Sequence, residues 1–208
     1  MKIEIWSDIM CPWRYIGKRR LETALARFEH RDQVEVVWRS FELRPDQPRT
    51  PGPTLGEMMQ HRLGLQPGSA VGLFAEIERL AQEEGLHIEL TGVQPVNSFD
   101  AQRLVHLAAD HGLASQMKER LFRGYLGEQR NVADPDVLLE LALDVGLDPV
   151  AVKATLDGDA YAADVRGDEE LGARRGVTGV PGFFINGGQV SSGVPSTQAL
   201  LQHLIQAR

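Results

Sequence analysis

The sequence contains a single cysteine, Cys11, so no disulfide can form within the chain. Any disulfide at Cys11 must join it to another molecule. The sequence also has no run of about 18 apolar residues, the length that a membrane-spanning helix needs. Glu4 and Asp8 interrupt the N-terminal apolar stretch, which therefore does not have the pattern of a secretory signal. These absences predict a cytoplasmic protein with a reduced thiol and no membrane partner.

An excess of positive charge is missing as well. The formal net charge is −7, with 22 Lys and Arg residues against 29 Asp and Glu residues. Nucleic-acid-binding proteins carry a basic patch or stripe, so this balance argues against a nucleic-acid partner. The 6 histidines are scattered and form no cluster with Cys11 at metal-site spacing. We therefore expect no metal.

The N-terminal region has the pattern of a strand, a helix and a second strand. Residues 2–7 are rich in Ile and Trp and predict the first strand. Pro12 suits the first turn of a helix, and apolar residues at helical spacing extend that helix over residues 12–29. Residues 34–41 are β-branched and aromatic, which predicts the second strand. This order favours a parallel pair of strands joined by a crossover helix.

The middle of the chain is predicted to be helical. Four prolines between residues 45 and 53 exclude a helix or a central strand there, so we interpret this stretch as a linker. Thr54 and Glu57 then form a candidate capping box, and helical periodicity continues to about residue 176. Further helix starts are predicted from capping residues at Asn97 or Ser98, Asp134, Asp148 and Ser196.

The C-terminal region returns to strands before a last helix. The cluster at residues 179–182 predicts a turn, and the apolar residues 183–185 predict a short strand. Asn186 and Gly187 predict a tight hairpin that leads into a strand at residues 189–192.

The predicted order is therefore β-α-β, a set of helices, and then β-β-α, which is an α/β fold. We predict that residues 1–52 and 177–208 form one domain and that residues 53–176 form a helical domain inserted into it.

Cys11 lies where the first strand ends and the helix begins. A helix N-terminus has unpaired backbone N–H groups and a partial positive charge, and both favour a thiolate. Arg14 lies one turn further on and Lys18 one turn beyond it, so both cations should favour the thiolate, whereas Asp8 would oppose them. We expect a low pKa for the Cys11 thiol. From position alone, an inert buried cysteine is the alternative.

Two weaker features also have alternative readings. Val180-Pro181 precedes a strand, and a cis peptide would explain this placement, although an ordinary trans turn is the commoner form. The basic run from Lys18 to Arg20 predicts a solvated helix face, with an anion site formed by Arg14 and Lys18 as the alternative.

Three segments of the chain together resemble the DsbA-like branch of the thioredoxin superfamily. They read SDIMCPWRYIGKRRLE at residues 7–22, NSFDAQRL at residues 97–104 and GVTGVPGFFI at residues 176–185. The resemblance is closest to the FrnE-type oxidoreductases, with 2-hydroxychromene-2-carboxylate isomerases and kappa-class glutathione transferases as relatives. It covers nearly the whole chain and implies a thioredoxin-like fold with an inserted helical domain.

The resemblance also implies roles for individual residues. In that family the positions of Cys11 and Arg14 are usually both cysteines, of which the first attacks a disulfide and the second resolves the mixed disulfide. The proline at the position of Pro181 is cis and faces the active cysteine. By this implication Cys11, Arg14 and Pro181 form the catalytic set.

Substrate contacts are implied at three further positions. The backbone of the residue before the cis proline, here Val180, pairs with bound peptide or glutathione in the family. Pro12 and Trp13 flank the cysteine and are expected to contact substrate, with Trp13 partly exposed. Residues 192–196 lack the acid of the Ser-Asp pair that usually holds glutathione, which argues against tight glutathione binding.

Arg14 in place of a second cysteine excludes a dithiol oxidase cycle within this chain. The sequence therefore predicts a thiol–disulfide oxidoreductase that works through Cys11 alone on a protein or small-molecule substrate. It would have no tightly bound cofactor and would use glutathione or another low-molecular-weight thiol as co-substrate. A glutathione-dependent isomerase or transferase acting on aromatic or polyketide-type molecules, and a non-catalytic binding module, are the alternatives. The resemblance also allows a homodimer.

Overall fold

The computed structural model describes residues 1–64, 66, 68–177, 182–191 and 193–207. Its strands are β1 (Lys2–Ser7), β2 (Glu35–Ser40), β3 (Gly182–Ile185) and β4 (Gly188–Ser191). Its helices are α1 (Pro12–Ala26), α2 (Leu55–Leu63), α3 (Ser69–Glu83), α4 (Phe99–Asp110), α5 (Ala114–Phe122), α6 (Pro135–Val145), α7 (Pro149–Asp157), α8 (Ala162–Arg174) and α9 (Thr197–Gln206). A short 3-10 turn, η1 (Arg31–Gln33), precedes β2, and a π-helical turn, η2 (Arg123–Gly127), directly follows α5.

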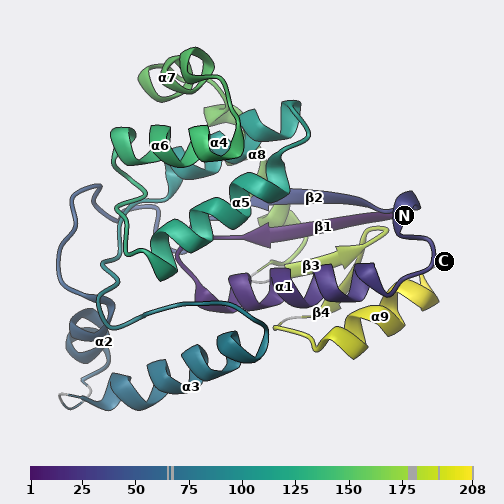
Figure 1. Ribbon diagram of the computed structural model, residues 1–208, viewed down its shortest axis with the longest axis horizontal. Helices are drawn as coiled ribbons and strands as arrows, with labels where there is room; N and C mark the ends of the chain where they lie inside the picture. Colours follow the sequence, from purple (N-terminus) through teal and green to yellow (C-terminus); the bar gives the residue numbers. More distant parts are fainter. Residues whose placement is uncertain (65, 67, 178–181, 192, 208) are drawn as a thin grey trace.

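The strands form one mixed sheet in the order β2-β1-β3-β4 (Figure 1). Strand β1 runs parallel to β2, with Ile5 opposite Trp38, and antiparallel to β3, with Ile5 opposite Phe183. Helix α1 makes the crossover between the two parallel strands. The α/β thioredoxin-like fold that the sequence predicts is confirmed.

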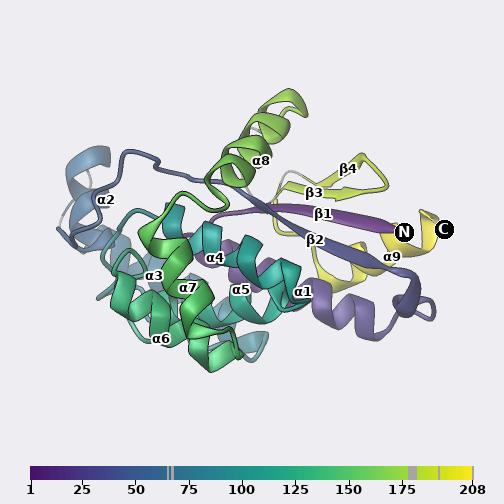
Figure 2. The ribbon, with the colours of Figure 1, turned by 90° about the horizontal axis from the view of Figure 1, so that it is seen from above.

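Helices cover both faces of this sheet. Figure 2 shows α8 on one side of the strands and α1 and α9 on the other. Side chains alternate along β1 accordingly: Trp6 packs in a small cluster with Phe184 on the α8 side, whereas Ile3 and Ile5 belong to the main core. The rings of Trp6 and Phe184 meet edge to face, with centroids 5.1 Å apart. Both faces of β1 are thus buried, so the strand is fixed firmly where it leads toward Cys11.

The hairpin between β3 and β4 forms at the predicted residues. Asn186 and Gly187 have φ values of 48° and 83°, the two left-handed conformations that a tight hairpin turn requires. Asn186 also accepts a hydrogen bond from the backbone N–H of Lys2 at 3.0 Å. The turn is therefore tied to the start of β1.

The ends of several elements differ from the prediction by a few residues. Helix α1 ends at Ala26 instead of residue 29. Phe28 lies in the turn that follows the helix, where its N–H donates to the carbonyl of Leu25 and its side chain is buried. Strand β2 is shorter by one residue at each end than the predicted 34–41, and β4 begins and ends one residue earlier than the predicted 189–192.

All the regular elements that the structure describes between β2 and β3 are helical, namely helices α2 to α8 and the turn η2. The predicted caps form at Thr54, which makes a full capping box with Glu57, and at Asp134, Asp148 and Ser196. At the start of α4 the side chain of Asn97 accepts from the N–H of Phe99 at 2.9 Å, while that of Ser98 makes no capping bond. The division into a domain of residues 1–52 and 177–208 and an insertion of residues 53–176 stays a prediction.

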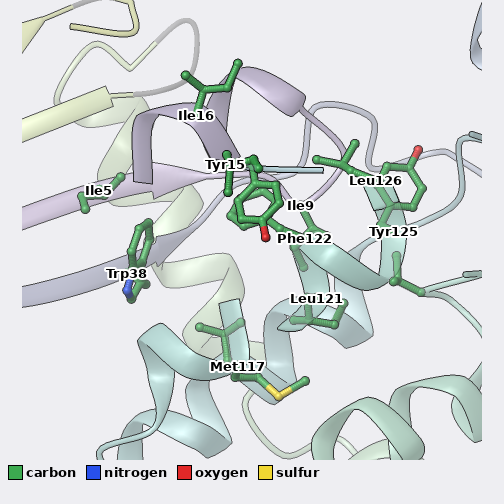
Figure 3. Packing of buried hydrophobic residues seen from close by; sticks show 14 of the residues in the cluster. Ile5, Ile9, Tyr15, Ile16, Trp38, Met117, Leu121, Phe122, Tyr125 and Leu126 are labelled. Carbon is green, nitrogen blue, oxygen red and sulfur yellow. The ribbon is translucent and has the colours of Figure 1, made fainter. Parts of the chain in front are cut away.

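The main hydrophobic core joins the sheet to the helices. Figure 3 shows residues of β1, α1, α5 and η2 packed together, and the rings of Tyr15 and Phe122 stack with centroids 5.1 Å apart. Burying a side chain of this size contributes about 1.5–3 kcal/mol. Helices α1 and α5 are therefore held in a fixed relation close to Cys11. Within the described part of the chain, no helix combines the length and the apolar character needed to cross a membrane.

Candidate active site

Cys11 is the N-cap residue of α1. Its backbone is extended, with φ −106° and ψ 117°, and Pro12 occupies the first helical position, where a missing N–H removes no helical hydrogen bond. The N–H of Arg14 donates to the carbonyl of Cys11 at 3.0 Å and closes the first turn. The cysteine side chain is half-buried. The structure thus places the only thiol of the chain at the start of a helix, as the sequence predicts.

Asp8 fixes the loop that carries Cys11. Its carboxylate is fully buried and accepts hydrogen bonds from the N–H of Met10 at 3.2 Å and from the N–H of Leu43 at 2.6 Å. One bond lies within the loop between β1 and α1, and the other reaches the segment that leaves β2. Asp8 therefore connects the two loops that follow the parallel strands.

The side chain of Arg14 lies against the Cys11 thiol. Arg14 is only 2% exposed, and its positive charge acts on the Cys11 thiol. Its Nε and Nη1 atoms have no hydrogen-bond partner among the described residues. Burial lowers the pKa of Arg14 to about 10, while the Cys11 and Asp8 charges act to raise it. The guanidinium is therefore charged at neutral pH and has unused N–H donors beside the sulfur.

The expectation of a low pKa for the Cys11 thiol is wrong for the ligand-free chain. Burial raises the pKa of Cys11, and the negative charge of Asp8 adds to this effect. The charge of Arg14 and the backbone N–H groups of Trp13 and Arg14 act to lower it. The free-energy cost of removing the thiolate from water is larger than the stabilisation that the helix N-terminus and Arg14 provide. The resting site therefore holds mainly the thiol.

The basic run after Arg14 is neither a solvated helix face nor an anion site with Arg14. Lys18 is 2% exposed, and its Nζ lies 2.5 Å from carboxylate oxygens of both Glu22 and Glu119. Arg19 also pairs with Glu119, at 2.9 Å. Arg20 pairs with Glu84. All three cations of this run therefore form ion pairs that attach α1 to the middle region of the chain. Both readings of this run made from the sequence are corrected.

The remaining predicted site residues divide into two groups. Pro12 is buried, and Trp13 is half-buried and packs against the main core, while their contacts with substrate stay predictions. Val180 and Pro181 lie outside the described residues, so the cis peptide and the position of Pro181 opposite Cys11 stay predictions. Gly182, the next residue, is opposite Trp6 near the carboxyl end of β1.

Lys118 is a residue near the site that sequence reasoning missed. It is fully buried, and its Nζ donates to the carbonyl of Ser7 at 3.1 Å and to Oε1 of Gln102 at 2.9 Å. Burial lowers its pKa to about 7, with the charges of Asp8 and Arg14 acting in opposite directions. No pattern in the sequence indicated this role, because a lysine on an amphipathic helix is usually exposed.

Tyr125 is a second residue whose place could not be foreseen. It is buried and comes from the π-helical turn after α5, which interrupts the regular helical spacing. Burial raises the pKa of Tyr125, and the charges of Asp8, Arg44 and Cys11 also act on it. Its helical spacing from Leu121 and Phe122 indicated only a core position.

Comparison with known proteins gives the family. Residues 2–205 match the model of the DSBA-like thioredoxin domain, and the chain belongs to this family. The fold is superimposable, with a TM-score of 0.94, on a probable DsbA oxidoreductase of Streptomyces coelicolor, which is 39% identical and is matched over 100% of this chain and 89% of its own.

Two further similarities extend this comparison. The protein YwbO of Bacillus subtilis, which is described as uncharacterised, is 31% identical over 186 residues, covering 88% of this chain and 86% of its own. A cytosolic disulfide reductase, DsbM of Pseudomonas aeruginosa, solved with GSH, shares the fold with a TM-score of 0.69 at 21% identity, over 99% of this chain and 98% of its own.

Proposed function

We propose that this chain is a thiol–disulfide oxidoreductase that works through Cys11 alone. The observation that carries the proposal is the pair formed by a half-buried thiol at the first turn of α1 and a buried cation, Arg14, that contacts it. Membership of the DSBA-like family supports the reaction class. The family position for a resolving cysteine holds Arg14 here, so resolution must come from outside the chain.

The reaction then has two exchange steps. The Cys11 thiolate attacks one sulfur of a substrate disulfide, forms a mixed disulfide with that half and releases the other half as a thiolate. An external thiolate next attacks the substrate sulfur of the mixed disulfide. This restores the Cys11 thiolate and releases a new disulfide. In each cycle one external thiol is consumed and one substrate thiol is released, so one disulfide is exchanged for another, and no electron acceptor other than the disulfide is needed.

Arg14 matters most while Cys11 carries negative charge. The resting thiol has a raised pKa, so the thiolate forms in a small fraction of molecules at neutral pH. Arg14 and the N–H groups of the first turn of α1 are the groups that stabilise it once it forms. We propose that they also stabilise Cys11 as a leaving group when the external thiol attacks.

The co-substrate is proposed to be a low-molecular-weight thiol. The fold-level similarity to a disulfide reductase solved with GSH supports glutathione or a thiol of that kind as a transient partner, with no tightly bound cofactor. We place Pro12, Trp13 and Val180 at the substrate contact, with Pro181 opposite Cys11. A cytoplasmic location and a homodimer complete the proposal, and the cytosolic DsbM neighbour is compatible with the former.

Steady-state turnover tests this function. The purified chain is given a small disulfide and an excess of glutathione, and the release of thiol is followed. Turnover above the uncatalysed exchange, abolished in Cys11→Ser, is the expected result. If Cys11→Ser retains the full rate, the thiol enzyme is excluded.

A further inference from the structure

Beside Cys11, the side chain of Arg14 has buried hydrogen-bond donors without a partner in the described part of the chain. Arg14 is 2% exposed, and its Nε and Nη1 have no partner among the residues that the structure describes. A buried guanidinium with unsatisfied N–H groups is costly, because these groups have lost their hydrogen bonds to water and gained none in the protein. Buried donors without a partner point to a group that binds beside them during function.

The burial of Arg14 limits what this ligand can be. Arg14 belongs to the first turn of α1, of which Cys11 is the N-cap, and the charges of the two side chains interact. A bulky anion from solvent cannot reach atoms that are this well covered. An oxygen bonded to the Cys11 sulfur, or about to bond to it, can reach them. The ligand that fits is therefore a small oxygen species at Sγ.

The guanidinium of Arg14 forms stronger hydrogen bonds with a negatively charged oxygen than with sulfur. In disulfide exchange the negative charge is spread over large, polarisable sulfur atoms, which are weak hydrogen-bond acceptors. When a thiolate cleaves a peroxide, negative charge concentrates on the departing oxygen. Guanidinium N–H groups form strong charge-assisted bonds with such an oxyanion. Arg14 is thus matched to an oxygen leaving group.

We propose that Cys11 also reduces small hydroperoxides, with Arg14 holding the departing oxygen and then the oxygen of a Cys11 sulfenate. The sulfur of the thiolate attacks the nearer peroxide oxygen, the O–O bond breaks, and the alkoxide or hydroxide leaves with the proton that the thiol released. Cys11 is oxidised to the sulfenic acid, and the peroxide is reduced to alcohol or water.

The sulfenic acid is returned to the thiol by external thiols. A first thiol condenses with it, giving a mixed disulfide on Cys11 and water, and a second thiol releases Cys11 and forms a small disulfide. In total one hydroperoxide and two thiols give an alcohol, one water and one disulfide. The chain has no second cysteine that could condense with the sulfenate. The oxidised state therefore waits for a thiol from solution.

Trapping with dimedone tests the first step. The reduced protein is mixed with hydrogen peroxide, and the dimedone adduct of the Cys11 sulfenate is measured by mass spectrometry against time. In parallel, the rate of mixed-disulfide formation with oxidised glutathione is measured without peroxide. If only the reaction with oxidised glutathione fails, the proposed oxidoreductase function is contradicted. If only sulfenate formation with peroxide fails, peroxide reduction is contradicted.

Variants at Arg14 separate the two reactions. Arg14→Met removes the donors and keeps much of the side-chain volume, and it should slow sulfenate formation about 100-fold, as loss of an oxyanion donor does elsewhere. The ratio of the peroxide rate to the disulfide rate should fall at least about tenfold, and Arg14→Lys should recover part of it. Circular dichroism verifies that both variants are folded.

The peroxide inference is overturned by either of two results. One is a wild-type rate with hydrogen peroxide no higher than that of free cysteine at the same pH. The other is an unchanged ratio of the two rates in folded Arg14→Met. A bulky hydroperoxide should react more slowly than hydrogen peroxide, since only a small molecule reaches the buried guanidinium.

Discussion

The guanidinium of Arg14 contacts the thiol of Cys11 three residues earlier, in the first turn of α1, and is 2% exposed. The position at which the DsbA-like resemblance implies a second cysteine thus holds a buried positive charge. Because residue 14 is an arginine, the chain has no internal resolving thiol. The same arginine places a cation beside any negative charge that develops at Cys11. The properties of the site depend on the balance between this cation and the burial of the sulfur.

The first prediction is that Arg14→Cys creates an internal disulfide. The two positions lie within one helical turn, where the N–H of residue 14 bonds to the carbonyl of Cys11 at 3.0 Å. Cα atoms at this spacing lie within the roughly 7 Å that a disulfide spans. Thiol titration after mild oxidation should show loss of both thiols, and dithiol oxidase activity should rise. Arg14→Ser serves as the control without a second thiol, and a fully reduced Arg14→Cys protein would contradict the prediction.

The second prediction concerns the pH dependence of Cys11 alkylation. Burial raises the pKa of the thiol, so the thiolate fraction at pH 7 should be smaller than that of free cysteine, whose pKa is about 8.5. The alkylation rate should therefore be low at pH 7 and still rise above pH 9. Arg14→Met should move the curve to higher pH, because Arg14 favours the thiolate. A rate that is already constant at pH 7 would show a low pKa and refute this assignment.

The third prediction concerns Lys118 and stability. The folded chain releases the Lys118 proton at a pKa of about 7, whereas the unfolded chain holds it to about 10.4. Above pH 7 the unfolded state thus binds more protons, so this group raises the free energy of unfolding with pH, by about 1.4 kcal/mol per unit. Chemical denaturation between pH 7 and about 7.8, below the pKa of about 8.5 of an unperturbed thiol, measures this slope.

The control variants for Lys118 isolate the slope from other groups. Lys118→Met should remove the slope, whatever its effect on stability at one pH. Lys153→Met, at an exposed lysine on α7, should leave the slope unchanged. Equal slopes in the wild type and Lys118→Met would mean that Lys118 is charged in the folded chain at these pH values.

The fourth prediction is that Asp8 holds the active loop. Asp8→Ala leaves the N–H groups of Met10 and Leu43 without their carboxylate acceptor, at a combined cost of about 2–5 kcal/mol. Urea denaturation should show this loss, and Asp46→Ala, at an exposed acid in the same region, should show almost none. A loss below about 0.5 kcal/mol in Asp8→Ala would show that the loop does not depend on this carboxylate.

The sequence predicted the order of elements because that order depends on local patterns. The Asn186-Gly187 turn, the proline at the start of α1 and the cap at Thr54 each need only a few neighbouring residues, and the structure confirms all three. The position of Cys11 followed from the same signals.

The electrostatics of the site could not be predicted in the same way. The pKa of Cys11 depends on how deeply the sulfur is buried, and this depends on packing that comes from distant parts of the chain. Lys18 was expected near Cys11, but Glu119, about one hundred residues away, pairs with it. Lys118 contacts Ser7 because α5 packs beside β1, and no local pattern in the sequence predicts this packing.

The central claim is that Cys11 performs thiol exchange without an internal resolving thiol. Incubation of the reduced protein with oxidised glutathione, followed by intact-mass spectrometry, tests this claim most directly. The account predicts one glutathione adduct on Cys11, absent in Cys11→Ser, that persists after the reagent is removed and is released only when an external thiol is added. A protein that gains no adduct while its Cys11 remains open to alkylation would contradict the account.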